Sequence, residues 1–85
     1  MMDVTAKIAR VFPEGNMRAS ANVVLGGCFI IHGVKLIVLE DKTFISMPSR
    51  KHQDRFFDTC HPLDTETRTR IQEAVIAAYN ELEPE

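Results

Sequence analysis

The feature that most constrains the fold is an alternation of apolar and polar side chains from Met17 to Val23, with the apolar face continuing to Leu25. Successive side chains of a β-strand point to opposite faces, so this pattern predicts a strand with one buried face and one solvent-exposed face. Such a strand needs neighbouring strands at its edges and a covering layer on its apolar face. The rest of the chain must therefore supply both.

The segments on either side of this strand predict its neighbours. An apolar face made by Val4, Ala6, Ile8 and Phe12, with Arg10 as its exception, indicates a first strand, and the Pro-Glu-Gly-Asn segment at 13–16 suits a tight turn after it. Gly26-Gly27 suits a two-residue hairpin turn on the other side. The apolar, β-branched run 28–39 that follows is predicted to be a strand covered on both faces.

Two further features complete the strand region. His32-Gly33 lies inside the apolar run, and a glycine there weakens the ladder of hydrogen bonds, which predicts a β-bulge. After a charged turn at 40–42, the segment 43–47 predicts a short fourth strand. Residues 48–61 show no period, and we expect them to form a loop.

The last element predicted is a helix from Thr65 to Leu82, with Asp64 as its N-cap. Strands followed by one helix predict an α+β fold: a four- to five-stranded antiparallel sheet followed by one C-terminal amphipathic helix packed on it. We expect residues 1–85 to form a single domain, since the chain is short and shows no linker. The apolar face of the helix consists of Ile71, Ala74, Val75, Ala78, Tyr79 and Leu82.

The charge of the chain is unevenly distributed although its formal net value is only −2. Residues 1–57 hold eight Lys/Arg against five Asp/Glu, whereas residues 58–85 hold two against seven. A polyanion would therefore meet the first two thirds of the protein, and the C-terminal end, with Glu81, Glu83 and Glu85, is acidic. The two cysteines, Cys28 and Cys60, fit free thiols in a reducing compartment. Because the sequence also shows no targeting pattern, we expect a cytoplasmic protein, with association with the nucleoid as an alternative.

The candidate binding site is a cluster of basic residues inside the predicted loop: Arg50, Lys51 and Arg55, with His52 between them. Exposed guanidinium and ammonium groups on such a segment can reach successive phosphates of a nucleic acid and release counterions. A solvated surface turn is the ordinary alternative. Three further cations would extend the patch if the sheet brings them to the same side, namely Arg18, Lys35 and Lys42.

Arg68 and Arg70 lie near the start of the predicted helix, where a cation faces the positive end of the helix dipole. They could form a phosphate site with the helix N-terminus. The spacing of four residues from Asp64 to Arg68, and from Glu66 to Arg70, favours ion pairs instead. We therefore predict that both arginines are paired rather than free to bind.

Phe56 and Phe57 follow the basic cluster. Exposed rings stack on unpaired bases, but adjacent phenylalanines after a loop more often return to the core. We expect at most one of the two to be exposed, which is a weak indication of single-strand binding.

The cysteine and histidine pairs Cys28/His32 and Cys60/His61 do not have the spacing of zinc ligands, so no metal is expected. A Cys-His dyad completed by Asp58 would be a thiol enzyme, but no oxyanion loop or glycine-rich phosphate cradle accompanies it. The residues predict neither catalysis nor a cofactor.

Several motifs together resemble the SpoVG family of septation proteins over nearly the whole chain, from Met2 to about Leu82. Where that family commonly has a Thr-Pro-Asp-Gly type of turn after its basic pair, this chain has His52-Gln53-Asp54-Arg55. The segments that carry the resemblance are Met2-Asp3-Val4-Thr5, Glu14-Gly15-Asn16-Met17-Arg18-Ala19, Phe44-Ile45-Ser46-Met47-Pro48-Ser49-Arg50-Lys51, Asp58-Thr59-Cys60-His61-Pro62-Leu63, Thr67-Arg68 and Ile71-Gln72-Glu73-Ala74-Val75.

The resemblance implies a bacterial, compact α+β domain that forms a homodimer, binds DNA (in some members RNA) and influences septum formation, sporulation and gene expression. With the basic cluster, it leads us to expect a nucleic-acid-binding regulator without enzymatic activity, membrane association or small-molecule substrate. The alternative is a protein-interaction adaptor of the division or regulatory machinery. Its working surface would be the acidic C-terminal end, and the basic cluster would be incidental.

Overall fold

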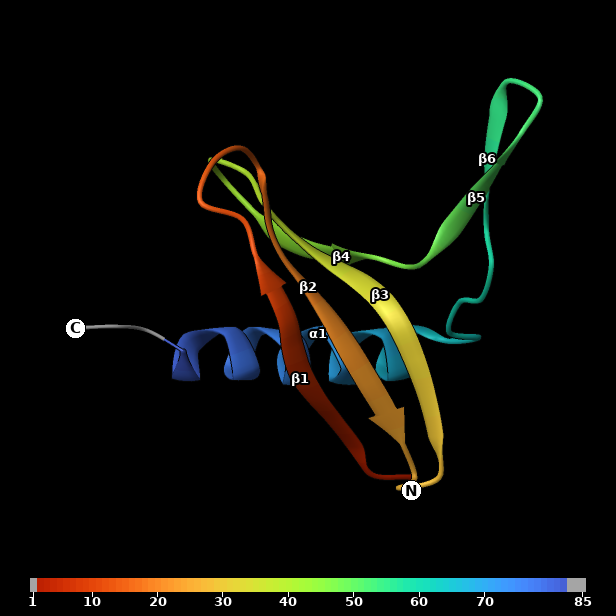
Figure 1. Ribbon diagram of the computed structural model, residues 1–85. Coiled ribbons are helices and arrows are strands. Elements are labelled where there is room, and N and C mark those ends of the chain that lie inside the picture. The colour runs from red at the N-terminus through yellow and green to blue at the C-terminus, as the bar shows by residue number, and fades with distance from the viewer. Residues whose placement is uncertain (1, 83–85) are drawn as a thin grey trace.

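The computed structural model, which describes residues 2–82, is a four-stranded antiparallel sheet with one helix across one face and a small separate hairpin (Figure 1). The predicted α+β architecture, with the C-terminal helix packed on the sheet, is confirmed. The main sheet has the order β1-β2-β3-β4 and the hairpin pairs β5 with β6. The elements are β1 Val4–Val11, β2 Met17–Leu25, β3 Phe29–Val38, β4 Thr43–Ser46, β5 Ser49–His52, β6 Arg55–Asp58 and α1 Thr65–Glu81.

The core lies between α1 and the inner face of the main sheet. The alternation that predicted β2 is confirmed, since Ala19, Ala21 and Val23 have no exposed surface and the residues between them are half-buried. From α1, Ile71 and Val75 are buried against this face. The remaining core side chains are Ile31, Val34, Leu36, Ile45 and Met47.

Irregularities in strand pairing determine which side chains face the core. In β3, Ile31 pairs with Val23 and Val34 with Ala21, so His32-Gly33 forms the predicted bulge, with Gly33 at a φ of +84° that suits glycine. In β1 the register shifts between Ile8 and Arg10. That shift moves Arg10 to the outer face, which explains why it breaks the alternation of its strand.

The predicted tight turn between β2 and β3 is also present. Gly26 and Gly27 both have positive φ, and the backbone N–H of Cys28 donates to the carbonyl of Leu25 over 3.2 Å. Two successive residues with positive φ define the hairpin turn whose twist matches that of the strands it joins.

The helix begins where the sequence predicts. Asp64 has extended backbone dihedrals, and its carboxylate accepts a hydrogen bond of 2.7 Å from the backbone N–H of Thr67. Hydrogen bonding from the Thr67 side chain, and then from its backbone, lowers the pKa of Asp64 below its ordinary value of 3.8. The predicted apolar face extends too far in one respect, because Leu82 follows the last helical residue and is 52% exposed.

The prediction of a loop over residues 48–61 is wrong for most of its length, because β5 and β6 form an antiparallel hairpin there. Every residue of both strands is exposed, so no apolar alternation marks them in the sequence. The turn contains Gln53 at a φ of +59° where a glycine or asparagine would have signalled a hairpin. Both usual signals are therefore missing.

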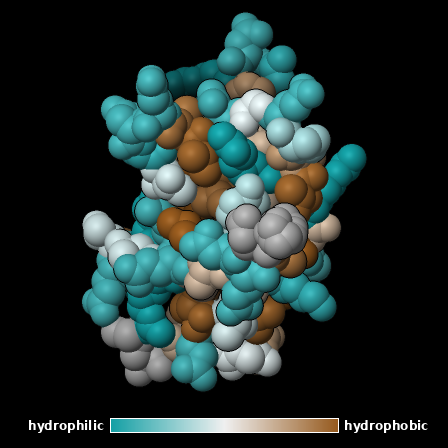
Figure 2. Space-filling model, turned by 90° about the vertical axis from the view of Figure 1, so that its left-hand side faces the viewer, coloured by the Kyte–Doolittle hydropathy of each residue, from teal (hydrophilic) through white to brown (hydrophobic). Residues whose placement is uncertain are grey.

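The outer face of the main sheet has no covering layer within residues 2–82 (Figure 1). Figure 2 views the molecule from the side of β1 and the C-terminal end of α1, where hydrophobic residues form separate groups among hydrophilic ones. In this described part of the chain, no helix is long and apolar enough to cross a membrane.

Truncation of a core side chain tests this packing. We expect Ile71→Ala to lower the free energy of unfolding by about 2–5 kcal/mol, because Ile71 is only 2% exposed and the neighbouring strands cannot close the cavity completely. Leu63→Ala is the control, since Leu63 is 93% exposed and its truncation should change stability by less than about 0.5 kcal/mol. Denaturant unfolding at one fixed protein concentration measures both, and equal effects would contradict the assigned core.

The capping carboxylate should make stability depend on pH. A carboxyl group whose pKa is lower in the folded than in the unfolded state stabilises the fold above its unfolded pKa, and the effect is lost as the pH falls through the folded value. We expect Asp64→Ala to be less stable than the parent at neutral pH, with the difference shrinking as the pH falls below 3.8. Asp64→Asn, a neutral cap, should lack this pH dependence in thermal unfolding curves.

Candidate nucleic-acid interface

The predicted basic cluster lies on the β5–β6 hairpin, which projects away from the main sheet (Figure 1). At the base of the hairpin the backbone N–H of Thr59 donates to the carbonyl of Pro48 over 2.7 Å. The strand pairing then runs from Ser49 opposite Asp58 to His52 opposite Arg55. The segment is therefore a two-stranded ribbon of regular geometry rather than an irregular loop.

Strand geometry divides the predicted site residues between two faces of this ribbon. Residues directly opposite each other in an antiparallel pair share a face, as do residues two apart along a strand. Arg50, His52 and Arg55 therefore lie on one face, together with Phe57, and we name these four residues the basic face. Lys51 lies on the opposite face with Phe56. A run that is continuous in sequence thus presents its cations in two directions.

Both phenylalanines of the hairpin are exposed, Phe56 by 71% and Phe57 by 48%, so the expectation that at least one returns to the core is wrong. Each ring has a cation nearby on its own face: Lys51 Nζ lies 6.0 Å from the centroid of Phe56, and Arg55 Cζ lies 5.9 Å from that of Phe57. Such contacts restrict the cations to the ribbon surface. The aromatic side chains therefore form part of the candidate interface.

The secondary basic candidates of the sheet lie in two separate places. Lys35 is on the outer face of β3, opposite Ser20 of β2 and Ser46 of β4, and Ser20 in turn pairs with Arg10. The result is a row of two cations and two hydroxyls across the uncovered face. The sequence alone does not indicate Arg10 here, because only the register shift of β1 places it in this row.

Arg18 and Lys42 lie at the end of the sheet where β2 begins and β4 follows its turn. Arg18 is exposed at a register shift of β2, and Lys42 Nζ lies 5.6 Å from the ring centroid of Phe44. Figure 1 shows this end of the sheet apart from the hairpin. The structure therefore does not join these two residues to the predicted cluster.

Neither ion pair predicted at the helix start forms among residues 2–82. Asp64 caps the helix, and the guanidinium of Arg68 donates instead to the carbonyl of Ile45 over 2.9 Å in a partly buried position. Sequence spacing could not reveal this contact, because it joins α1 to β4 across 23 residues. Arg68 thus connects the helix to the strand that leads into the hairpin.

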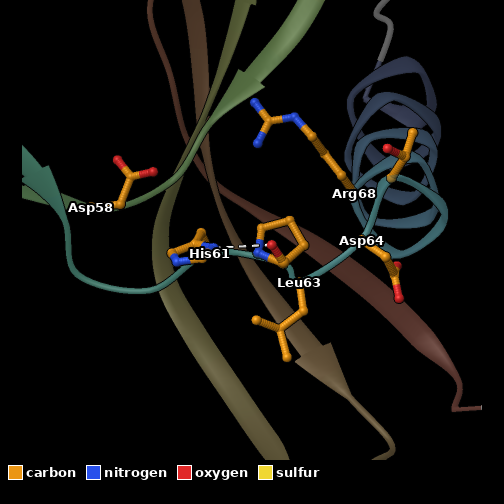
Figure 3. Close-up of a pocket in the computed structure, with 7 residues that line it drawn as sticks. Asp58, His61, Leu63, Asp64 and Arg68 are labelled. Atoms are coloured by element: carbon orange, nitrogen blue, oxygen red, sulfur yellow. Dashed lines mark hydrogen bonds between the residues drawn. The ribbon is translucent and has the colours of Figure 1, made fainter.

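An open pocket of about 380 Å³ lies between the end of β6 and the start of α1 (Figure 3). Its lining includes Asp58, Asp64 and the exposed Leu63, and His61 Nδ1 lies 3.0 Å from the carbonyl oxygen of Pro62. The pocket contains the cation Arg68, but it also contains carboxylates, which repel a phosphate. It is therefore less suited to a polyanion than the hairpin.

The cysteine and histidine pairs considered above are engaged elsewhere. Cys60 packs against the core while His61 turns to the Pro62 carbonyl, and His32 Nδ1 lies 3.1 Å from Asn22 Oδ1. Among residues 2–82 no group of three or more His, Cys, Asp or Glu side chains is placed to hold a metal ion. The geometry therefore offers no assembled Cys-His dyad.

The fold and the candidate site define a small α+β protein whose basic residues are displayed on an exposed β-ribbon. The family model of SpoVG matches residues 1–81. A SpoVG protein of Caldicellulosiruptor bescii, named for septation, is 41% identical over 80 residues, covering 92% of this chain and 91% of that protein. The chain belongs to the SpoVG family.

Other relatives agree with this assignment. A SpoVG protein of Clostridium acetobutylicum is 38% identical over 86 residues, covering 99% of this chain and 90% of the relative. One from Listeria monocytogenes is 39% identical over 80 residues, covering 92% of this chain and 78% of the relative. Both carry names that refer to septation.

Replacement of Arg68 tests its structural role. We expect Arg68→Met to lower the free energy of unfolding by about 1 kcal/mol, because the hydrogen bond to the Ile45 carbonyl is lost while the hydrocarbon stem is kept. Arg70→Met, two residues along the same helix, is the matched control and should change stability by less than about 0.5 kcal/mol. Chemical denaturation measures both variants, and a neutral Arg68→Met would contradict the proposed connection.

Proposed function

We propose that the protein is a nucleic-acid-binding regulator without enzymatic activity, which acts in septation and gene expression as a homodimer. The observation that carries the proposal is the projecting hairpin with its exposed basic face. A two-stranded ribbon fits the major groove of B-DNA, and cations along it contact the phosphates on either side. The names of its relatives support the role in septation.

The charges of the hairpin favour binding through the basic face. Arg50 and Arg55 lie there without a carboxylate among the strand residues of that face, whereas Lys51 shares its face with Asp58. The planar guanidinium of arginine also binds a phosphate with two parallel hydrogen bonds, whereas lysine binds it as a point charge. In the proposed complex the two arginines of each protomer therefore contribute more than Lys51.

The exposed phenylalanines make RNA and single-stranded DNA further possible ligands of the same hairpin. An aromatic ring next to a cation stacks on an unpaired base at about 1–3 kcal/mol per base. Phe56 is the more exposed of the two and lies beside Lys51. Duplex binding would rest mainly on the basic face, with Lys51 as a further phosphate contact, whereas stacking would use Phe56 on the opposite face.

The dependence of affinity on salt tests the proposal. If the three cations of each protomer neutralise six phosphates per dimer, log K for a duplex should fall with log salt at a slope of roughly −5. In Arg50→Ala/Arg55→Ala the slope should change to roughly −2, because four of the six contacts are lost. Fluorescence anisotropy of a labelled duplex, measured over a series of salt concentrations, gives both slopes.

The matched control for this experiment is Arg18→Ala/Lys42→Ala, which removes the same charge from the end of the sheet that lies apart from the hairpin and should keep the slope of the parent within about one unit. Equal losses in both double variants would point to general electrostatic attraction rather than to the hairpin. If the parent binds no nucleic acid even at low salt, the adaptor alternative takes over. Of the acidic end invoked there, Glu81 ends α1, and Glu83 and Glu85 lie outside the described residues.

A further inference from the structure

The strands of the main sheet carry positive charge only. Within these four strands, all of which the structure describes, there are four Lys/Arg and no Asp or Glu. The helix that covers the inner face has two Arg against three Glu. The uncovered outer face of the sheet is therefore more positive than the side covered by the helix, and it attracts anionic ligands.

Three of these cations lie close together on the outer face. Arg10 and Lys35 flank Ser20 from the two neighbouring strands, and Lys7 lies opposite Asn22 in the next row of the same face. Neighbouring strands are about 4.8 Å apart and successive rows about 7 Å apart, so the backbone positions of the three cations are roughly 7–12 Å from one another. One ligand can therefore contact all three.

Neutral hydrogen-bonding groups lie between these cations. The first row contains the hydroxyls of Ser20 and Ser46, and the second contains the side chains of Asn22 and His32. His32 Nδ1 lies 3.1 Å from Asn22 Oδ1. Since an amide oxygen only accepts, the ring donates in this contact and the NH2 group of Asn22 takes no part in it. Hydroxyl and NH2 groups are donors that bind phosphate oxygens.

Two aromatic rings border the same face, each with a cation beside it. Arg10 Cζ lies 5.3 Å from the ring centroid of Phe12, and Lys42 Nζ lies 5.6 Å from that of Phe44. Phe44 is two residues from Ser46 along β4, so the two share a face. Both rings are half-buried, so the sheet holds them while part of each stays accessible. Nucleobases stack on such rings, whereas the carboxylates of an acidic peptide do not.

The relief of the face distinguishes a single strand from a duplex. Four polar side chains of the two rows are half-buried, namely Ser20, Asn22, Lys35 and Ser46. Side chains that protrude so little do not reach the base edges in the major groove of B-DNA, which is about 8.5 Å deep. A single strand needs no such protrusion, because its unpaired bases can turn toward the surface while its phosphates follow the cations.

We propose that the outer face binds an extended single strand of DNA or RNA. We name this surface the strand platform: Lys7, Arg10 and Lys35 contact phosphates, and Phe12 and Phe44 stack on bases. The inference goes beyond the function proposed above, because it assigns a second nucleic-acid surface that needs no residue of the hairpin. One protomer can then hold a duplex on the hairpin and a single strand on the platform.

The salt dependence of single-strand binding tests the platform. In Lys7→Gln/Arg10→Gln/Lys35→Gln the three charges are lost while most of the side-chain length is kept. The slope of log K against log salt should therefore become less negative by about 2. The probes are labelled oligo(dT) and oligo(U) of about 15 nucleotides, measured separately by fluorescence anisotropy. Tighter binding of one of them by the parent identifies DNA or RNA as the ligand.

The matched control is Arg50→Gln/Lys51→Gln/Arg55→Gln, which removes the same charge from the hairpin. It should keep the single-strand slope within about one unit of the parent and lose duplex binding, whereas the platform variant should do the reverse. Thermal unfolding checks that both variants are folded. A platform variant that binds single strands like the parent, or a control that loses them, would overturn the proposal. Preference of the parent for poly-glutamate over both oligonucleotides would overturn it as well.

Photochemical cross-linking locates the bound strand directly. On irradiation, 5-iodouracil in an oligonucleotide becomes joined to an aromatic side chain on which it stacks. We expect mass spectrometry of the digested parent to show the adduct at Phe12 or Phe44, because these rings border the platform. Adducts at Phe56 or Phe57 alone would place the strand on the hairpin and contradict the assignment.

These measurements separate the two proposals. Strand binding that depends on the platform cations, in a protein that binds no duplex, would retain the platform and overturn the function of the hairpin. Duplex binding that depends on the hairpin, in a protein that binds single strands nowhere else, would do the reverse.

Discussion

The contact on which the rest of the structure depends is that of Ile71 and Val75 of α1 with the small side chains of β2. Ala19 and Ala21 are small and have no exposed surface, so the larger side chains of the helix can pack over the centre of the sheet. One helix suffices to cover this face. Because the chain has no second helix within residues 2–82, the outer face and the edges remain accessible for binding.

The parts of the fold that bury an apolar face could be predicted from the sequence. The alternation of β2, the double glycine before β3 and the N-cap Asp64 each indicate an element that the structure contains. The hairpin could not be predicted, because all its residues are exposed and its turn contains Gln53 in a conformation that side chains rarely adopt. Periodicity reports burial, and an element that buries nothing has no periodicity to detect.

The candidate site shows the same division. Its residues were identified by composition alone, since Arg50, Lys51, His52 and Arg55 are close in sequence whatever the segment folds into. Their separation into two faces needed the strand register, and the contact of Arg68 with the Ile45 carbonyl needed the tertiary fold. Local sequence therefore indicates the chemical type of the site, whereas the direction of its side chains in space depends on contacts between distant segments.

The hairpin is joined to the rest of the protein at its base and contributes no side chain to the core. Exchange of its exposed residues therefore costs little in folding free energy, typically within about 0.5 kcal/mol per substitution. A sequence can then drift at this ribbon while the sheet and helix stay under strict selection for packing. If the hairpin binds as proposed, related proteins with one common scaffold would in this way come to recognise different targets, and a designer could graft a new recognition sequence at the same place.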